Sequence, residues 1–362
     1  MNILLVYGGK SCEHDVSIIT ACLAKGYFDG NLYCAYFNQQ NKCFLAPNGL
    51  APNQHKGWKF DTAVTFVMGQ SAICLQRGRR KAKIVPIDVA VNCCHGVNGE
   101  DGSVAGLLQM AGIPSVESGV IGSAICMDKY LSKLAFMGAG FPVLDGVLVS
   151  KVEYERGEID SKLADFGCPV IVKPTTLGSS IGVGVAHNQA ELNKALQVAF
   201  CFDERVLVER ALTSFWEVNC SAMTVDGKVA TSRADRPLQS GEILTFADKY
   251  LAGGKGFASK SQVDDTFATQ AQSLTKQIYQ TFDMQGVVRV DYIVDAATNQ
   301  MYVNEVNVVP GSLAYNLWDD VYTRRQFGKV LVQNALDTHK RKQRLSYRYQ
   351  STVLDGANFA KK

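Results

Sequence analysis

The chain has 362 residues, of which 47% are hydrophobic and 20% are charged. This balance indicates two or three folded domains and excludes a disordered or fibrous protein. Its 37 basic and 34 acidic residues leave a net charge of +3, which is too small to indicate nucleic acid or an anionic membrane as the main partner.

Eleven cysteines are spread along the chain without a C-x-x-C pair, which indicates reduced, mostly buried thiols. The five histidines are too dispersed to form a zinc motif. No apolar run approaches the roughly 20 residues that span a bilayer, and the first apolar run is shorter than a secretion signal. We therefore expect a cytoplasmic protein.

The first 120 or so residues alternate strands with helices, which is the pattern of a parallel α/β domain. Apolar strands are expected at 2–7 and 84–94, with helices from residue 16 and at 104–110. Short alternating runs within 38–83 predict an inserted hairpin, whose place in the sheet stays open.

The remaining pattern predicts two further α/β regions. The first has helices at 121–137 and 191–200 and strands at 146–150, 169–173, 181–186 and 206–209. The second has strands at 217–225, 286–294 and 300–306, helices at 264–282 and 322–344, and a mobile tail at 351–362.

The strongest chemical signal lies in the last two strands. Alternation places Arg289 and Asp291 on one face, and an antiparallel return puts Asp291 almost opposite Glu305, with Glu305 and Asn307 on the same face as Val303. Two carboxylates this close repel unless a cation lies between them. Mg²⁺ shared with phosphates prefers such a set. The alternative is the solvated polar face of an edge hairpin.

A second signal is a lysine at a strand end followed by a turn of small residues. Lys173 supplies a charge, and Gly178, Ser179 and Ser180 supply hydroxyl and unhindered backbone N–H groups, which can together surround a polyphosphate. Neither this segment nor residues 9–11 forms a Walker A motif. The alternative is an ordinary serine-rich turn.

Two further features follow the first strands, at the sheet edge where ligands bind in open α/β sheets. One is Glu13, for which the alternative is an acid that begins a helix. The other is the glycine-rich turn at 95–102, which precedes a helix whose N-terminus is suited to an anion. Its alternative is a plain βα turn.

Taken together, the motifs resemble the D-alanine–D-alanine ligase family of ATP-grasp enzymes. The matching blocks follow the family order and lie at 8–17, 95–102, 127–129, 172–174, 178–180, 249–250, 289–291, 304–307 and 310–311. The resemblance implies an N-terminal parallel-sheet, Rossmann-like domain at 1–125, ATP-grasp subdomains at 126–212 and 213–350, and a tail at 351–362.

The resemblance also implies roles for individual residues. Those expected to bind ATP are Lys129, Lys173, Ser180, Glu209, Ala211, Glu217, Lys249 and Asn304, with Glu209 and Ala211 at the adenine and Glu217 at the ribose. Asp291, Glu305 and Asn307 would hold two Mg²⁺ ions, which Mn²⁺ can replace. The catalytic set would be Glu13, Ser179, Tyr250, Arg289 and Gly311, and further substrate contacts would come from His95, Asn316 and Leu317.

The implied activity is the ATP-dependent joining of two D-alanines through an acyl phosphate for peptidoglycan, in a homodimer without nucleic-acid or membrane partners. A mobile loop at 239–256 would exclude water, and Tyr250 favours an amine acceptor. Asn316 stands where the family has a serine, and Leu177 replaces a usually acidic residue. Two alternatives stay open: a ligase with D-serine, D-lactate or a non-wall amino acid as acceptor, and a non-catalytic ATP-binding regulator.

Overall fold

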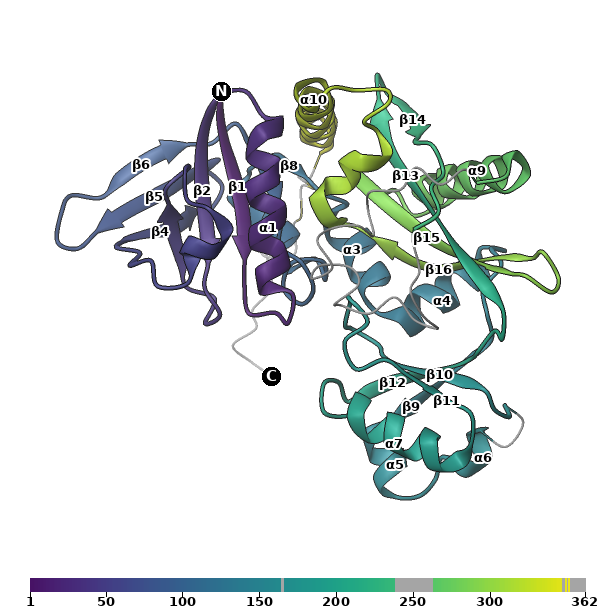
Figure 1. Ribbon diagram of the computed structural model, residues 1–362. Helices are drawn as coiled ribbons and strands as arrows, with labels where there is room; N and C mark the ends of the chain where they lie inside the picture. Colours follow the sequence, from purple (N-terminus) through teal and green to yellow (C-terminus); the bar gives the residue numbers. More distant parts are fainter. Residues whose placement is uncertain (164–165, 238–262, 347–348, 350, 352–362) are drawn as a thin grey trace.

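The computed structural model describes residues 1–163, 166–237, 263–346, 349 and 351, and its strands form three sheets (Figure 1). The expected loop at 239–256 and nearly all of the expected tail lie outside these residues. Within the described ranges, no helix has both the length and the apolar character needed to cross a membrane. All eleven cysteines are free, as expected, but only five of them are buried.

The first sheet has eight strands in the order β6-β5-β4-β3-β2-β1-β7-β8. Its parallel half consists of β1 (Asn2–Gly8), β2 (Asn31–Phe37), β7 (Val89–Asn92) and β8 (Ser115–Val116). Its antiparallel half consists of β3 (Cys43–Ala46), β4 (Thr62–Val67), β5 (Ala72–Arg77) and β6 (Lys83–Pro86). The expected parallel sheet is therefore confirmed for half of the strands. The segment expected to form an inserted hairpin instead adds four antiparallel strands, β3 to β6, to one edge of this sheet.

Two helices cover this sheet, and short 3₁₀ turns lie beside them. The elements are α1 (His14–Ala24), η1 (Lys25–Tyr27), η2 (Pro52–His55) and α2 (Ser103–Ala111). Leu4, Phe66 and Leu108 belong to the core between one face of the sheet and α2. The helix α1 lies on the other face, toward the C-terminal part of the molecule (Figure 1).

Two elements that were expected to be continuous are divided. The strand expected at 84–94 is wrong, because the chain leaves the edge strand β6 after Pro86 and enters the parallel strand β7 at Val89. The helix expected at 121–137 is also wrong. It separates into α3 (Gly119–Met127) and α4 (Lys129–Gly138), because Asp128 is extended and its carboxylate caps the second helix.

The central sheet is antiparallel, in the order β11-β10-β12-β9. Its strands are β9 (Gly146–Ser150), β10 (Val170–Pro174), β11 (Gly184–Ala186) and β12 (Arg205–Arg210). The helices α5 (Lys151–Glu155), α6 (Asp160–Leu163) and α7 (Gln189–Ala199) lie beside it (Figure 1). Val172, Leu196 and Val208 are among the buried residues of its separate core.

The C-terminal sheet is antiparallel, in the order β14-β13-β15-β16. Its strands are β13 (Phe215–Val225), β14 (Lys228–Thr231), β15 (Val287–Asp295) and β16 (Met301–Asn307). Around it lie α9 (Asp265–Thr281), the turn η4 (Gly311–Leu317) and α10 (Arg324–Gln343). One hydrophobic core joins this sheet to the first sheet and includes Tyr27, Trp318 and Phe327.

The predicted register of β15 and β16 is confirmed, since Asp291 lies opposite Glu305. A β-bulge follows directly, so that Tyr292 pairs with Val303. Tyr292 and Val303 are buried in the core, whereas Asp291 and Glu305 line the pocket. The expectation that Val303 shares a face with Glu305 is therefore wrong, because the bulge inserts one residue and reverses the alternation.

Candidate active site

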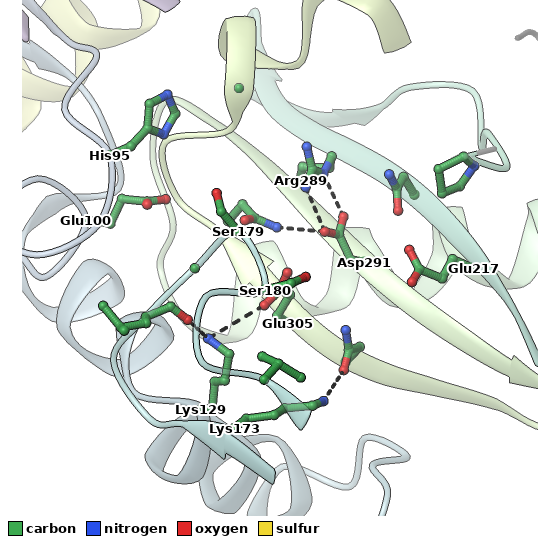
Figure 2. Close-up of a pocket in the computed structure, with 18 of the residues that line it drawn as sticks. His95, Glu100, Lys129, Lys173, Ser179, Ser180, Glu217, Arg289, Asp291 and Glu305 are labelled. Atoms are coloured by element: carbon green, nitrogen blue, oxygen red, sulfur yellow. Dashed lines mark hydrogen bonds and ion pairs between the residues drawn. The ribbon is translucent and has the colours of Figure 1, made fainter. Parts of the chain in front are cut away.

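A pocket lies where the three sheets meet, and side chains from all three regions point into it (Figure 2). The first region contributes residues of the turns after β1 and β7. The central region contributes the end of β10 and its following turn, and the C-terminal sheet contributes β13, β15 and β16. Residues far apart in the sequence thus form one polar site.

Glu13 links the first region to the turn of small residues that follows β10 and contains Ser179. It precedes α1, but its side chain makes no capping hydrogen bond to that helix. Its carboxylate, in a side chain only 6% exposed, accepts a hydrogen bond from the Ser179 hydroxyl. A Cβ atom at Gly96 or Gly178 would lie 2.8 Å from a carboxylate oxygen of Glu13. The two glycines therefore leave room for this carboxylate. Glu13 also lies at the start of α1, so the helix-start alternative stays open beside a role in the pocket.

Lys173 lies at the end of β10 in a buried ion network. Its ammonium contacts the carboxylate of Glu209, whose other oxygen lies 2.5 Å from Nζ of Lys133. Burial opposes the charge of Glu209, but the two lysines hold its pKa at about 2. Lys173 also donates to Oδ1 of Asn304 at 3.2 Å. Glu209 thus fixes the ammonium group at the pocket wall.

Lys129 is the second cation on the same side of the pocket (Figure 2). It begins α4, directly after the capping residue Asp128. Its ammonium donates to the carbonyl oxygen of Leu177 and lies 3.8 Å from a carboxylate oxygen of Glu305. Two fixed ammonium groups can neutralise the charge of a polyphosphate.

The floor of the pocket is an ion pair and a carboxylate pair on β15 and β16. Asp291, only 7% exposed, accepts from Nε of Arg289 at 2.6 Å, from its Nη2 at 2.7 Å and from Nδ2 of Asn307 at 3.0 Å. Glu305 lies opposite on the neighbouring strand. Burial of Asp291 contradicts the alternative of a solvated edge hairpin. Among the described residues, no three His, Cys, Asp or Glu side chains converge, so the oxygen set is two carboxylates and an amide.

The turn at 95–102 places His95 and Glu100 against the pocket. Burial lowers the pKa of His95 to about 4, and the positive charge of Arg289 acts in the same direction. The turn binds its own carboxylates, since Gly96 N–H donates to Glu100 at 2.8 Å and Asn98 N–H donates to Asp101 at 2.8 Å. These N–H groups are therefore engaged by the chain itself, which disfavours the anion expected at this position.

Glu100 carries a proton near neutral pH. Burial raises its pKa to about 8, and the negative charge of Glu13 adds to the effect. An unfolded glutamate titrates near 4.5. The folded state therefore holds a proton that the unfolded state releases, and this contribution to the free energy of unfolding is lost as the pH rises from about 5 to 8.

Glu100→Gln should remove this part of the pH dependence, because the amide cannot ionise. Between pH 5.5 and 8.5 the parent protein should lose at least about 1.4 kcal/mol more stability than the variant, which corresponds to one pKa unit. Denaturant unfolding at several pH values measures this difference. Glu204→Gln, at an exposed position, serves as the control and should keep the parent slope. An unchanged slope in Glu100→Gln would contradict the prediction.

The other expected site residues fall into three groups. Those that line the pocket are Glu13, His95, Lys129, Lys173, Ser179, Ser180, Glu217, Arg289, Asp291, Asn304, Glu305, Asn307 and Gly311. Four others are not among the residues that line the pocket, namely Glu209, Ala211, Asn316 and Leu317, of which Glu209 and Leu317 are buried. Lys249 and Tyr250 lie outside the described residues.

Sequence reasoning missed two polar residues of the pocket, Glu100 and Asn219. Asn219 lies two residues after Glu217 on β13 and opposite Asp291, and its buried Oδ1 atom has no hydrogen-bond partner among the residues that the structure describes. Strand alternation from Glu217 would have identified it. Glu100 belonged to a recognised motif, but its contact with Val309 depends on the tertiary structure.

The arrangement is suited to chemistry that needs positioning and neutralisation of charge. The lysines can hold phosphates, the carboxylates and amide can share a divalent cation with them, and Arg289 can stabilise a developing anion. Glu13 can bind an ammonium group beside this centre. These are the requirements of phosphoryl transfer to a small amphoteric substrate.

Comparison with known proteins agrees with this chemistry. Two family models match, described as D-ala D-ala ligase N-terminus over residues 2–118 and D-ala D-ala ligase C-terminus over residues 136–327. A D-alanine–D-alanine ligase from Thermoanaerobacter sp. (strain X514) is 32% identical over 357 residues, covering 94% of this chain and 98% of the relative.

Solved structures extend the similarity to the fold. The D-alanine–D-alanine ligase from Helicobacter pylori has a TM-score of 0.76 at 26% identity and covers 92% of this chain and 98% of its own. A D-Ala:D-Ser ligase from Enterococcus faecalis has a TM-score of 0.77 at 23% identity and covers 92% of this chain and 99% of its own. The three sheets described above are thus the fold of known ligases.

Proposed function

Because the chain belongs to the D-alanine–D-alanine ligase family, it is an ATP-dependent ligase that joins two D-alanines, and we propose that the pocket between its three sheets performs this reaction. The observation that carries the proposal is the pocket floor. There Asp291 and Glu305 lie opposite each other beside Arg289, facing the ammonium groups of Lys129 and Lys173.

ATP binds along the central and C-terminal sheets. Lys129, Lys173 and Ser180 hold its phosphates, and Asn304 orients Lys173. Glu217 binds the ribose, Glu209 and Ala211 form the adenine side, and Lys249 reaches the γ-phosphate. The ion network around Glu209 supports this assignment, because it fixes the Lys173 ammonium before the nucleotide enters.

Asp291, Glu305 and Asn307 fit a site for two Mg²⁺ ions, which Mn²⁺ can replace. Two carboxylates and an amide oxygen on paired strands match the preference of Mg²⁺ for few protein oxygens together with phosphate oxygens. The bound metal supplies neutralisation of the phosphate charge. Arg289 neutralises part of the charge of this carboxylate set through its ion pair with Asp291.

The reaction has two steps. The γ-phosphoryl group moves from ATP to the carboxylate of the first D-alanine, which gives ADP and an acyl phosphate. The neutral amine of the second D-alanine then attacks the acyl carbon, and the bond between this carbon and the phosphate oxygen breaks. The amine proton ends on the released phosphate, so that the products are the dipeptide and hydrogen phosphate.

Different residues of the chain bind the two D-alanines and stabilise the oxyanion. Glu13, with Ser179 and Tyr250, binds the ammonium group of the first D-alanine, and His95 lies beside this group. Arg289 and the N–H of Gly311 stabilise the oxyanion of the second step. Gly311, Asn316 and Leu317 shape the pocket for the second D-alanine, whose carboxylate can accept hydrogen bonds from the Gly311 N–H and the Asn316 amide.

An acceptor panel tests the proposed function. The purified protein is given ATP, Mg²⁺ and D-alanine alone or with D-serine, D-lactate or L-amino acids, and ADP release and product mass are measured. We expect D-alanyl-D-alanine as the main product. A different main product would show that the ligase uses another acceptor. ATP binding without amino-acid-dependent ADP release would instead favour a non-catalytic ATP-binding regulator.

Asn316→Ser should keep D-alanine activity within about twofold of the parent. The serine retains a hydrogen-bond donor, and the turn around residue 316 is held through the main chain, since the Asn316 carbonyl accepts from Arg233. The ratio of kcat/KM for D-alanine in the two proteins measures the effect. A loss of more than tenfold would show that the amide of Asn316 itself is required.

We further propose that the enzyme works in the cytoplasm as a homodimer that binds neither nucleic acid nor membranes. The small net charge of +3 supports the part of this proposal that concerns nucleic acid and membranes. Light scattering of the purified protein tests the oligomeric state.

A further inference from the structure

A buried threonine on α1 connects the turn that carries Gly311 to the histidine of the 95–102 turn. Thr20, only 2% exposed, has its hydroxyl 2.8 Å from Nε2 of His95 and accepts from the backbone N–H of Ser312 at 3.3 Å. His95 in turn makes a hydrogen bond to the backbone of Val309. Thr20 and His95 therefore contact the chain on both sides of Gly311.

The direction of each hydrogen bond follows from the charge state of His95. Its pKa of about 4, set mainly by burial, makes the ring neutral at pH 7. A neutral imidazole has one N–H donor and one acceptor nitrogen. The ring N–H of His95 donates to the Val309 carbonyl, so Nε2 is the acceptor nitrogen. Nε2 therefore accepts a hydrogen bond from the Thr20 hydroxyl group. The oxygen of this hydroxyl can in turn accept from the Ser312 N–H.

The segment held in this way has an unusual backbone. Ser312, Leu313 and Ala314 have φ angles of 52°, 55° and 55°, although residues with a side chain rarely adopt this left-handed region. Such a conformation persists only where surrounding contacts enforce it. The hydroxyl of Tyr27, 3.3 Å from the Ser312 carbonyl, is a further contact from the first region.

We propose that Thr20 is a positioning residue, whose hydroxyl group fixes the turn from Val309 to Ser312 so that the Gly311 N–H points at the reacting acyl group and the second D-alanine. The inference rests on the proposed function, since it assigns Thr20 a task only if Gly311 serves that reaction. Under this proposal, the contact between Thr20 and the turn at Gly311 determines how much dipeptide forms per phosphate released. It does not affect the binding of ATP.

Thr20→Val tests the proposal, because valine keeps the shape of threonine and lacks its hydroxyl group. The Ser312 N–H and His95 Nε2 then lose their partner. We expect kcat to fall roughly ten- to a hundredfold, the scale seen when a reacting group is misplaced, while the KM for ATP stays within about twofold. Dipeptide formed per phosphate released should also fall, because water replaces the misplaced amine at the acyl phosphate.

Two matched variants separate positioning from structure. Thr20→Ser restores the hydroxyl group and should return both kcat and the coupling ratio to near the parent values. Thr338→Val removes the hydroxyl of a similarly buried threonine on α10, 7% exposed, and should change neither. Thermal unfolding of all three variants reports any loss of fold.

The outcomes distinguish the inference from the proposed function. If the parent protein forms no dipeptide, the proposed function fails. If the parent is active and Thr20→Val matches it in kcat and coupling, the positioning role of Thr20 is overturned. The positioning role is also overturned if Thr20→Ser loses as much activity as Thr20→Val. The same holds if the activity of Thr20→Val falls only in proportion to the fraction of this variant that is unfolded.

Discussion

Asp291→Asn and Glu305→Gln should each lower the rate of dipeptide formation by several orders of magnitude while the fold survives. Each change replaces a carboxylate of the proposed metal site by a neutral amide of the same size, so a divalent cation loses a charged ligand. Asp291→Asn in addition removes a carboxylate that accepts two hydrogen bonds from the Arg289 guanidinium. The loss should therefore be larger in this variant.

The measurement combines D-alanine-dependent ADP release with Mn²⁺ binding in the presence of ADP. Asp295→Asn is the matched control, because it lies on the same strand but its carboxylate accepts from Ala297 and Thr298 at the hairpin turn. The rate of ADP release and the Mn²⁺ affinity of Asp295→Asn should stay within about twofold of those of the parent protein. Near-normal activity of Asp291→Asn or Glu305→Gln in saturating Mg²⁺ would refute the metal assignment.

Lys173→Met should weaken ATP binding by about a hundredfold and lower the free energy of unfolding by roughly 3 kcal/mol. The first effect follows from the loss of a phosphate-binding charge. The second follows because Glu209, only 3% exposed, keeps its negative charge with one lysine instead of two, and loss of one partner from a buried ion pair is strongly destabilising.

The pH dependence and a double variant separate these two effects. The folded-state pKa of Glu209, about 2, lies below its ordinary value of 4.5. Its ion pairs therefore stabilise the protein above about pH 4.5 and lose their effect toward pH 2, so the stability gap between parent and variant should narrow over this range. Lys173→Met with Glu209→Gln should recover stability but not ATP affinity. Recovery of both would contradict a role of Lys173 at the phosphates.

The pairing of Asp291 with Glu305 could be predicted because a single short turn determines the register of a hairpin. The bulge beside this pair could not be predicted, since residue types do not indicate where one extra residue enters a strand. The bulge has a functional consequence. It allows two successive residues, Asn304 and Glu305, to line the same pocket.

Motifs identified the lysines and carboxylates of the site, but not the groups that support them. Lys133 and Thr20 lie within helical segments and carry no local signal of their contacts with Glu209 and His95. The protonation of Glu100 likewise depends on its burial beside Glu13, which comes from a separate turn. Such features arise only when segments distant in the sequence meet.

The core shared by the first and last regions determines when the protein can finish folding during synthesis. Tyr27 packs on Phe327, and Gly328 lies so close to Tyr27 that a Cβ atom would be 2.1 Å from its carbonyl oxygen. The helix α1 covers part of this face of the first sheet, and the part over β7 and β8 is covered by α10 only after the ribosome has released residues 324–343. The core against α2 and the core of the central sheet close earlier, from nearby residues. A nascent chain that lacks α10 thus leaves part of this apolar face exposed to chaperones.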